Sequence, residues 1–136
     1  MSFQTCLIDL ERFMSKEWRV HAKDDPLSSL SFNEFDYLKV IQYSSEPIRI
    51  TDLASEMMVT KPSASNMVVR LERKALVRRI SCPEDARAKR VVLTDKAIEG
   101  LSTEDSVLQI ITEKLENKVS EQEFKQLVKI LSKMLK

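Results

Sequence analysis

The fold is decided by residues 60–94, TKPSASNMVVRLERKALVRRISCPEDARAKRVVLT. The pattern predicts a helix, a strand, a tight charged loop and a second strand. The stretch contains nine basic and three acidic residues, a net charge of +6; because the whole chain carries +1, the remainder carries −5. A positive helix followed by a positive hairpin is typical of a surface that binds nucleic acid. We therefore expect this stretch to dock on duplex DNA and the rest of the chain to build and regulate a dimer around it.

The composition favours one mostly helical domain over residues 1–136. Hydrophobic residues make up 43% and charged residues 32%, as in a soluble globular protein with a highly charged surface. The single glycine disfavours an architecture rich in tight turns. We expect a cytoplasmic protein, because no basic segment followed by a long apolar run begins the chain and no apolar stretch is long enough to span a membrane. One histidine and two distant cysteines make no metal site, and with no catalytic motif we expect neither a cofactor nor an enzyme.

The first half of the chain is predicted to be a series of helices. Apolar residues at three- and four-residue steps predict a helix over residues 2–22. Ser31 and Glu34 form a capping box for a helix that ends near residue 44 and is apolar nearly all round, so we expect it to be buried. A short edge strand at residues 48–50 follows. Thr51 is expected to cap a short helix ending near residue 58, and a turn then leads to a helix over residues 62–74, which makes a helix-turn-helix.

The helix over residues 62–74 has two different faces. The apolar face is expected to contain Ala64, Met67, Val68, Leu71 and Ala75. The other carries short polar side chains first and arginines later, which suits insertion into a major groove, where Asn66 can bind adenine. Either Thr60 or Lys61 is the N-cap, and the proline that follows favours Lys61. The expected DNA contacts of this region are Thr60, Lys61, Pro62, Ser63, Ser65, Asn66, Val69, Arg70 and Arg73. The alternative is that its serines and asparagine only cap the helix.

The strands at residues 76–81 and 89–94 are predicted to form a basic hairpin, which after such a helix is a wing. Pro83 suits a turn in the connection, and Arg87 is placed to enter a minor groove. Asp85 is expected to pair with a nearby arginine and hold the tip. Lys89 and Arg90 complete the expected DNA-binding set. The alternative, an exposed hairpin held by ion pairs and without a partner, does not explain the excess of positive charge.

The order of elements, the segment LERKALVRRI and the wing resemble the MarR family of winged-helix transcription regulators. The wing signature of that family, D-x-R-x-x-x-V-x-L-T, matches Asp85 to Thr94 at all five fixed positions. The resemblance implies that Arg87 contacts the minor groove and that Asp85 stabilises the wing. The family often has a glycine in or near the wing, whereas this chain has Pro83 there.

The two ends of the chain are predicted to form a dimerisation region. Thr94 is expected to cap a long helix whose buried side carries Ile98, Leu101, Leu108, Ile111 and Leu115. Gly100 and the polar run after it are expected to loosen the first half of this helix. Ser120 and Glu123 form a second capping box. The first and last helices each carry an uncovered apolar stripe, which predicts that they pack together. In the resembling family these helices form the homodimer interface, here Phe3, Leu7, Leu10, Phe124, Leu127, Val128, Leu131, Met134 and Leu135. We therefore expect a DNA-binding lobe at residues 31–94, dimerisation helices at 1–22 and 95–136, and a near-palindromic operator.

Several residues are candidates for regulation of a repressor. Trp18 and His21 can line a pocket for a small aromatic effector, as the resemblance implies, or can simply be core residues. Cys6 lies on the helix that carries the reactive cysteine in oxidant-sensing members of the family; the alternative is that both cysteines are simple packing or surface residues. Cys82, at the wing base, is expected to be the more exposed of the two thiols. The leading hypothesis is a homodimeric repressor released by a small molecule; an oxidant-released repressor using Cys6 and a protein-docking module are its rivals.

Overall fold

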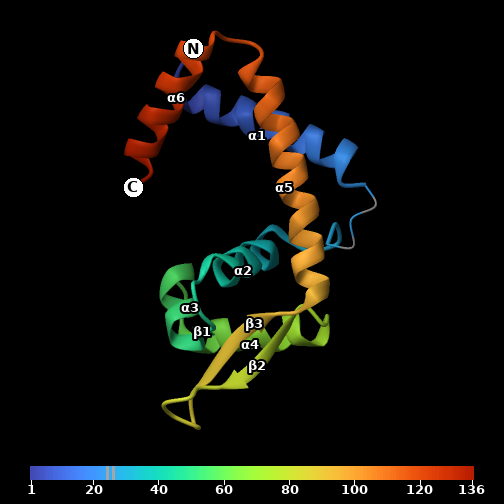
Figure 1. Ribbon diagram of the computed structural model, residues 1–136, viewed down its shortest axis with the longest axis vertical. Helices are drawn as coiled ribbons and strands as arrows, with labels where there is room; N and C mark the ends of the chain where they lie inside the picture. Colours follow the sequence, from blue (N-terminus) through green and yellow to red (C-terminus); the bar gives the residue numbers. More distant parts are fainter. Residues whose placement is uncertain (24, 26) are drawn as a thin grey trace. The chain divides into compact units, whose positions relative to one another are not determined.

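The computed structural model describes residues 1–23, 25 and 27–136. The described chain forms α1 (Phe3–His21), α2 (Phe32–Tyr43), β1 (Ile48–Arg49), α3 (Ile50–Met57), α4 (Lys61–Arg73), β2 (Val77–Ser81), β3 (Lys89–Leu93), α5 (Asp95–Glu116) and α6 (Glu121–Met134) (Figure 1). The predicted fold class, mostly helical with a small hairpin wing and helices at both ends, is confirmed. Both predicted capping boxes are present, at the starts of α2 and α6.

The strands form one antiparallel sheet in the order β1-β3-β2. Val91 of β3 lies opposite Ile48 of β1 on one side and Arg79 of β2 on the other, so the two-residue β1 fixes one edge of the hairpin to the segment before α3. The predicted edge strand is thus present but one residue shorter, because Ile50 already belongs to α3. The expectation that Thr51 caps α3 is wrong: the N-cap is Arg49, without a side-chain hydrogen bond, and Thr51 lies in the first turn.

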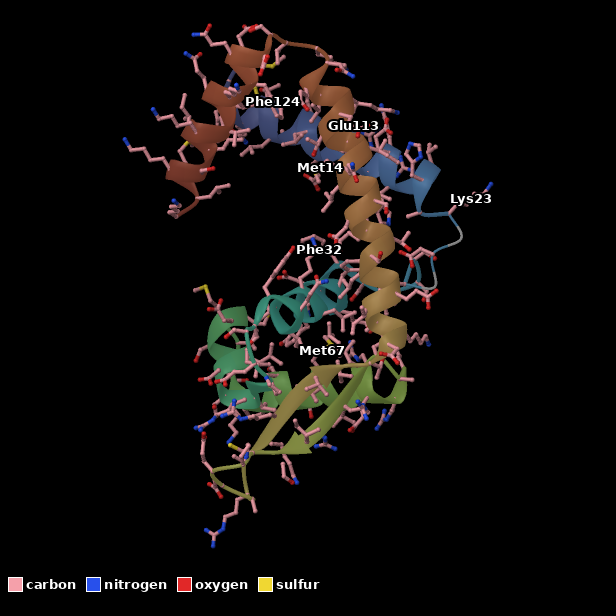
Figure 2. The ribbon with its side chains drawn as sticks, in the orientation of Figure 1. Met14, Lys23, Phe32, Met67, Glu113 and Phe124 are labelled. Carbon is pink, nitrogen blue, oxygen red and sulfur yellow. The ribbon has the colours of Figure 1, made fainter. Side chains whose placement is uncertain are left out.

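The chain divides into two compact units, and the second of them, Asp24–Thr103, contains the larger core. Its buried residues come from α2, α3, α4, the sheet and the start of α5; Figure 2 shows Met67 of α4 inside this unit. The buried face of α4 contains Ala64, Met67, Val68 and Leu71, as predicted. Burial of α2 all round is wrong: Tyr37 and Leu38 are buried, but Phe32 and Tyr43 are 89% and 75% exposed.

Two residues that are not glycine adopt left-handed backbone conformations where helices end. Ala75 has φ 60° and Met58 has φ 56°. After α4, the Leu76 N–H donates to the Leu71 carbonyl (3.0 Å) and the Ala75 N–H to the Glu72 carbonyl (3.0 Å), the two bonds of a Schellman motif. Ala75 is therefore an exposed helix terminator rather than a member of the buried face of α4, which corrects its predicted position.

Gly100 has a packing role in α5. The helix runs without interruption through Gly100, so the expected loosening is wrong. A Cβ added at this buried position would lie closer than 3.0 Å to both Cγ and Cδ1 of Leu27. Leu27 is 1% exposed, so the glycine makes room for a core side chain. Thr94 caps α5 as predicted: its Oγ1 accepts from the Ala97 N–H (3.3 Å) and donates to the Ala75 carbonyl (2.7 Å). Ile98, expected on the buried side, is half exposed.

The other unit contains Met1–Lys23 and Glu104–Lys136. Its small core consists of Ala22, Val107 and Ile111, against which Phe13, Met14, Trp18, Leu108 and Leu115 pack. No residue of α1 or α6 is fully buried. Parts of both apolar stripes remain exposed in the single chain, namely Phe3, Leu7 and Leu10 at the start of α1 and Leu127, Val128, Met134 and Leu135 towards the end of the chain. Within the described residues, none of the helices has the length and apolar character needed to cross a membrane.

Candidate nucleic-acid interface

The start of α4 is set by Thr60. Its Oγ1 accepts a hydrogen bond from the Ser63 N–H (3.3 Å) and donates one to Ser63 Oγ (2.9 Å). Lys61 and Pro62 are the first two residues of the helix, so the preference for Lys61 as the N-cap is wrong. The reason is chemical: the threonine hydroxyl can accept from a free N–H of the first turn, whereas a lysine ammonium cannot.

The predicted polar face of α4 points away from the core. Exposed positions are Thr60, Lys61, Pro62, Ser63, Asn66, Arg70 and Arg73, and Ser65 and Val69 are partly buried at its margins. The side chains near the N-terminus of the helix are small, which allows another surface to approach the backbone closely. Arginines follow one and two turns later, so the face changes from short hydrogen-bonding groups to long cations along its length.

The loop after β2 is held by its own backbone and by Asp85. Asp85 Oδ1 accepts from the Arg87 N–H (2.9 Å), and the Ala88 N–H donates to the Asp85 carbonyl (3.0 Å). Across the base of the loop, the Cys82 N–H donates to the Ala88 carbonyl (3.1 Å). The loop projects beyond the sheet with Arg87 exposed (Figure 1). The expected pairing of Asp85 with an arginine side chain is wrong, because its described hydrogen bond is with a main-chain N–H.

Some cations of residues 60–94 are already engaged within the protein. Lys74 Nζ lies 2.5 Å from Glu34 Oε2, and this pairing is the largest cause that lowers the pKa of the Glu34 carboxyl below its ordinary value. Arg79 Nη2 lies 3.1 Å from Glu72 Oε1. Both cations are therefore largely neutralised by a neighbouring carboxylate.

The remaining cations are directed outward, with one exception. In the part of the chain that the structure describes, no hydrogen bond or ion pair engages the side chains of Lys61, Arg70, Arg73, Arg78 and Arg87. Lys89 Nζ donates to Ser81 Oγ (3.3 Å), which leaves its charge uncompensated. The exception is Arg90, which was expected to contact DNA but is only 9% exposed. Its Nη1 donates to the Pro47 carbonyl (2.7 Å), so this arginine is a structural residue of the wing base.

The two thiols are placed opposite to expectation. Cys82 is buried at the wing base, whereas Cys6 is exposed on α1. Arg90 Nε lies 3.3 Å from Cys82 Sγ, and this hydrogen bond is the main cause that lowers the pKa of the Cys82 thiol. Sequence reasoning missed this contact, and it also missed Glu84 and Arg49, whose side chains meet at 2.6 Å. The pairing with Arg49 is the largest cause that lowers the pKa of the Glu84 carboxyl. Strand alternation gives no signal for the burial of Arg90, because Arg90 and Val91 are adjacent in β3 and point to opposite faces, yet both are buried.

Trp18 and His21 have different surroundings. Trp18 packs half-buried against the core of its unit, and His21 is exposed with Nε2 3.1 Å from Glu17 Oε2. Glu17 also accepts from Lys114 Nζ (2.7 Å), the main cause that lowers the pKa of its carboxyl. An open groove of about 340 Å³ lies elsewhere, lined by Val40, Tyr43, Ser44, Ile48 and Glu56. Among the described residues, no group of three or more histidine, cysteine or acidic side chains is arranged to hold a metal ion.

Helices α3 and α4 are joined by a tight turn, and the hairpin of β2 and β3 follows them. This arrangement is a winged helix-turn-helix. The sequence model of the MarR family matches residues 30–89, which run from the start of α2 to the start of β3. This segment, 60 of the 136 residues, is therefore similar to the MarR family.

Solved structures share the fold over almost the whole chain. MepR of S. aureus bound to ethidium bromide is 22% identical, with a TM-score of 0.73 and coverage of 99% of this chain and 95% of that one. A MepR–DNA complex from S. aureus is also 22% identical, with a TM-score of 0.71 and coverage of 99% and 97%. FabT of Streptococcus pneumoniae in complex with DNA is 20% identical, with a TM-score of 0.79 and coverage of 98% and 90%.

Proposed function

We propose that the protein is a transcription regulator that binds double-stranded DNA through α4 and the wing. The observation that carries the proposal is the separation of cations on residues 60–94: Lys74, Arg79 and Arg90 are engaged internally, and the others are exposed on one helix and one hairpin. The MarR-family match supports it, as do two similar structures that are DNA complexes. A surface with six uncompensated cations attracts a polyanion, and phosphate contacts supply most of the affinity.

The shape of the surface favours a duplex over a single strand. The small side chains at the start of α4 allow the helix to enter a major groove, where Asn66 binds an adenine edge and Arg70 and Arg73 contact phosphates. The projecting loop carries Arg87 into the neighbouring minor groove, where the negative potential is strongest if the groove is narrow. Asp85 serves this contact by fixing the backbone at Arg87.

The regulator acts as a homodimer, with the DNA-binding lobe at residues 31–94 and dimerisation helices at 1–22 and 95–136. Support comes from the exposed apolar stripes: Leu7 on α1 and Leu127 and Val128 on α6 are each about half exposed in the single chain. Covering these stripes with a second copy removes apolar area from water, which is the main driving force for association. A two-fold dimer presents two copies of α4 to successive turns of a near-palindromic operator, where it represses by blocking access to the promoter.

An effector releases the repressor by favouring a spacing of the two lobes that does not match the half-sites. We do not place this effector at Trp18 and His21, because Trp18 packs in the core of its unit and His21 is exposed beside Glu17.

Titration of a fluorescent random-sequence duplex at several salt concentrations tests DNA binding. The Arg70→Ala variant removes an exposed cation of α4, and Arg19→Ala removes the same charge from α1. Because each phosphate contact contributes about 0.9 to the slope of log affinity against log salt, Arg70→Ala should flatten the slope by up to about 2 for a dimer. Arg19→Ala should leave the slope unchanged. Absence of duplex binding by the parent protein at low salt would refute the proposal, and equal slopes for the two variants would refute the role of α4.

A further inference from the structure

The wing base contains a cluster that the resemblance to the MarR family does not explain. It consists of Glu84, Arg49, Arg90 and Cys82, here called the wing-base cluster. Glu84 Oε2 lies 2.6 Å from Arg49 Nη2 and 3.3 Å from Arg90 Nη2. Cys82 Sγ lies 3.3 Å from Arg90 Nε and 3.6 Å from Glu84 Oε2. One carboxylate oxygen is therefore shared by two guanidinium groups and a thiol.

The wing-base cluster joins three segments that are distant in the sequence. Glu84 belongs to the loop that carries Arg87, Arg90 to β3, and Arg49 to β1 immediately before α3. Arg90 extends the connection, because its Nη1 donates to the Pro47 carbonyl (2.7 Å) and lies 3.6 Å from Glu46 Oε1. The backbone pairing between β1 and β3 covers only two residues in each strand, so these side chains add a second connection between the loop and the helix-turn-helix.

We propose that Glu84 is a positioning residue for DNA binding: through Arg49 and Arg90 it holds the loop in the orientation that presents Arg87 beside α4. The inference rests on the proposed function. The Asp85 hydrogen bond shapes the tip of the loop locally, whereas Glu84 sets where that tip lies relative to the sheet. An exposed ion pair alone contributes little, but this carboxylate has two cationic partners, and the Arg90 side chain is only 11% exposed.

Simple electrostatics gives the opposite sign for the effect of Glu84. The carboxylate is an exposed negative charge on a surface proposed to face phosphates, so its removal should strengthen DNA binding if charge alone mattered. If Glu84 positions the wing, its removal weakens binding, because the apparent affinity falls with the fraction of wings in the binding orientation. The sign of the change separates the two accounts.

The test compares Glu84→Gln with Glu72→Gln in the full-length protein. Both substitutions remove one carboxylate that is paired with an arginine inside residues 60–94, but the Glu72–Arg79 pair joins α4 to β2 and does not involve the loop. We expect Glu84→Gln to weaken duplex binding about threefold to tenfold, because a smaller fraction of wings is oriented for binding. Glu72→Gln should bind at least as tightly as the parent. Equal or tighter binding by Glu84→Gln would overturn the inference.

A double-mutant cycle with Arg87→Ala separates positioning from general destabilisation. If Glu84 acts through the wing tip, Arg87→Ala costs clearly less affinity in the Glu84→Gln background than in the parent. An unchanged cost of Arg87→Ala would show that the loss does not pass through the tip, and would also overturn the inference.

Amide hydrogen exchange of the free protein provides a test without DNA. The Cys82 and Ala88 N–H groups should exchange faster in Glu84→Gln than in Glu72→Gln, and equal rates would argue against anchoring by Glu84. If the parent protein does not bind duplex DNA at all, the proposed function fails, while the exchange rates still decide whether Glu84 anchors the loop.

Discussion

Replacement of Gly100 by alanine should destabilise the protein although alanine is the better helix former. In an exposed helix the substitution would stabilise by about 1 kcal/mol. Here the new Cβ would lie closer than 3.0 Å to Cγ and Cδ1 of Leu27, whose side chain is 1% exposed and has no open space to enter. Overpacking of this kind costs about 1–3 kcal/mol, and we expect the cost to lie at the upper end of this range because the overlap is with a core residue. We therefore expect a net loss of about 1–2 kcal/mol in the free energy of unfolding.

The measurement is urea unfolding of four proteins: the parent, Gly100→Ala, Leu27→Ala and the double variant. Leu27→Ala alone should cost about 2–5 kcal/mol, because it leaves a cavity. In the double variant the added methyl occupies part of that cavity, so the combined loss should be smaller than the sum by about 1 kcal/mol or more. Stabilisation by Gly100→Ala, or strict additivity of the two losses, would refute the packing role of Gly100.

Three further outcomes follow from the structure. Arg87→Ala should weaken duplex binding and flatten the salt dependence by up to about 2 in slope for a dimer, measured by gel-shift titration; an unchanged slope would reject the wing contact. Ala75→Gly should raise the free energy of unfolding by about 0.5–1 kcal/mol, because the left-handed conformation at φ 60° is strained for alanine; an unchanged urea midpoint would contradict this. Glu34→Gln should lower the free energy of unfolding by about 1–2 kcal/mol near pH 7, since it removes the charged partner of Lys74. The folded pKa of Glu34 is depressed, so its contribution is fully present above its ordinary pKa of 4.5 and is lost as pH falls through the lower folded value. A stability difference that does not shrink as pH is lowered below 4.5 would contradict the assignment.

The fold class and most element boundaries were accessible from the sequence because local signals agreed with one another. The capping boxes at Ser31 and Ser120 mark helix starts through side-chain hydrogen bonds to nearby N–H groups, and both are present. The apolar face of α4 follows from helical periodicity, and the two β-branched runs follow from strand propensity. These signals depend on residues a few positions apart, which a single sequence displays directly.

The errors arose where a distant contact decides the outcome. The sequence makes Gly100 look like a weak point of its helix, because its need for space comes from Leu27, which is distant in the sequence. Ala75 was assigned to the α4 face because no local pattern reveals an alanine that ends a helix in place of glycine.

Arg90 was grouped with the DNA-binding cations because its partners at Pro47, Glu46 and Glu84 lie on segments that only the folded sheet brings together. Net charge is visible in a sequence. Which of the charges are already neutralised is visible only in a structure.

Selection of bound sequences from a pool of random duplexes examines DNA binding, two-fold symmetry and half-site spacing in one experiment. We predict enrichment of an inverted repeat whose half-sites are centred about one helical turn apart, roughly 34 Å. We also expect Asn66→Ala to relax the base preference within each half-site, while the affinity for random duplex changes little. A pool without enrichment, or enriched for a single half-site without symmetry, would contradict the claim that a two-fold dimer binds DNA through α4 and the wing.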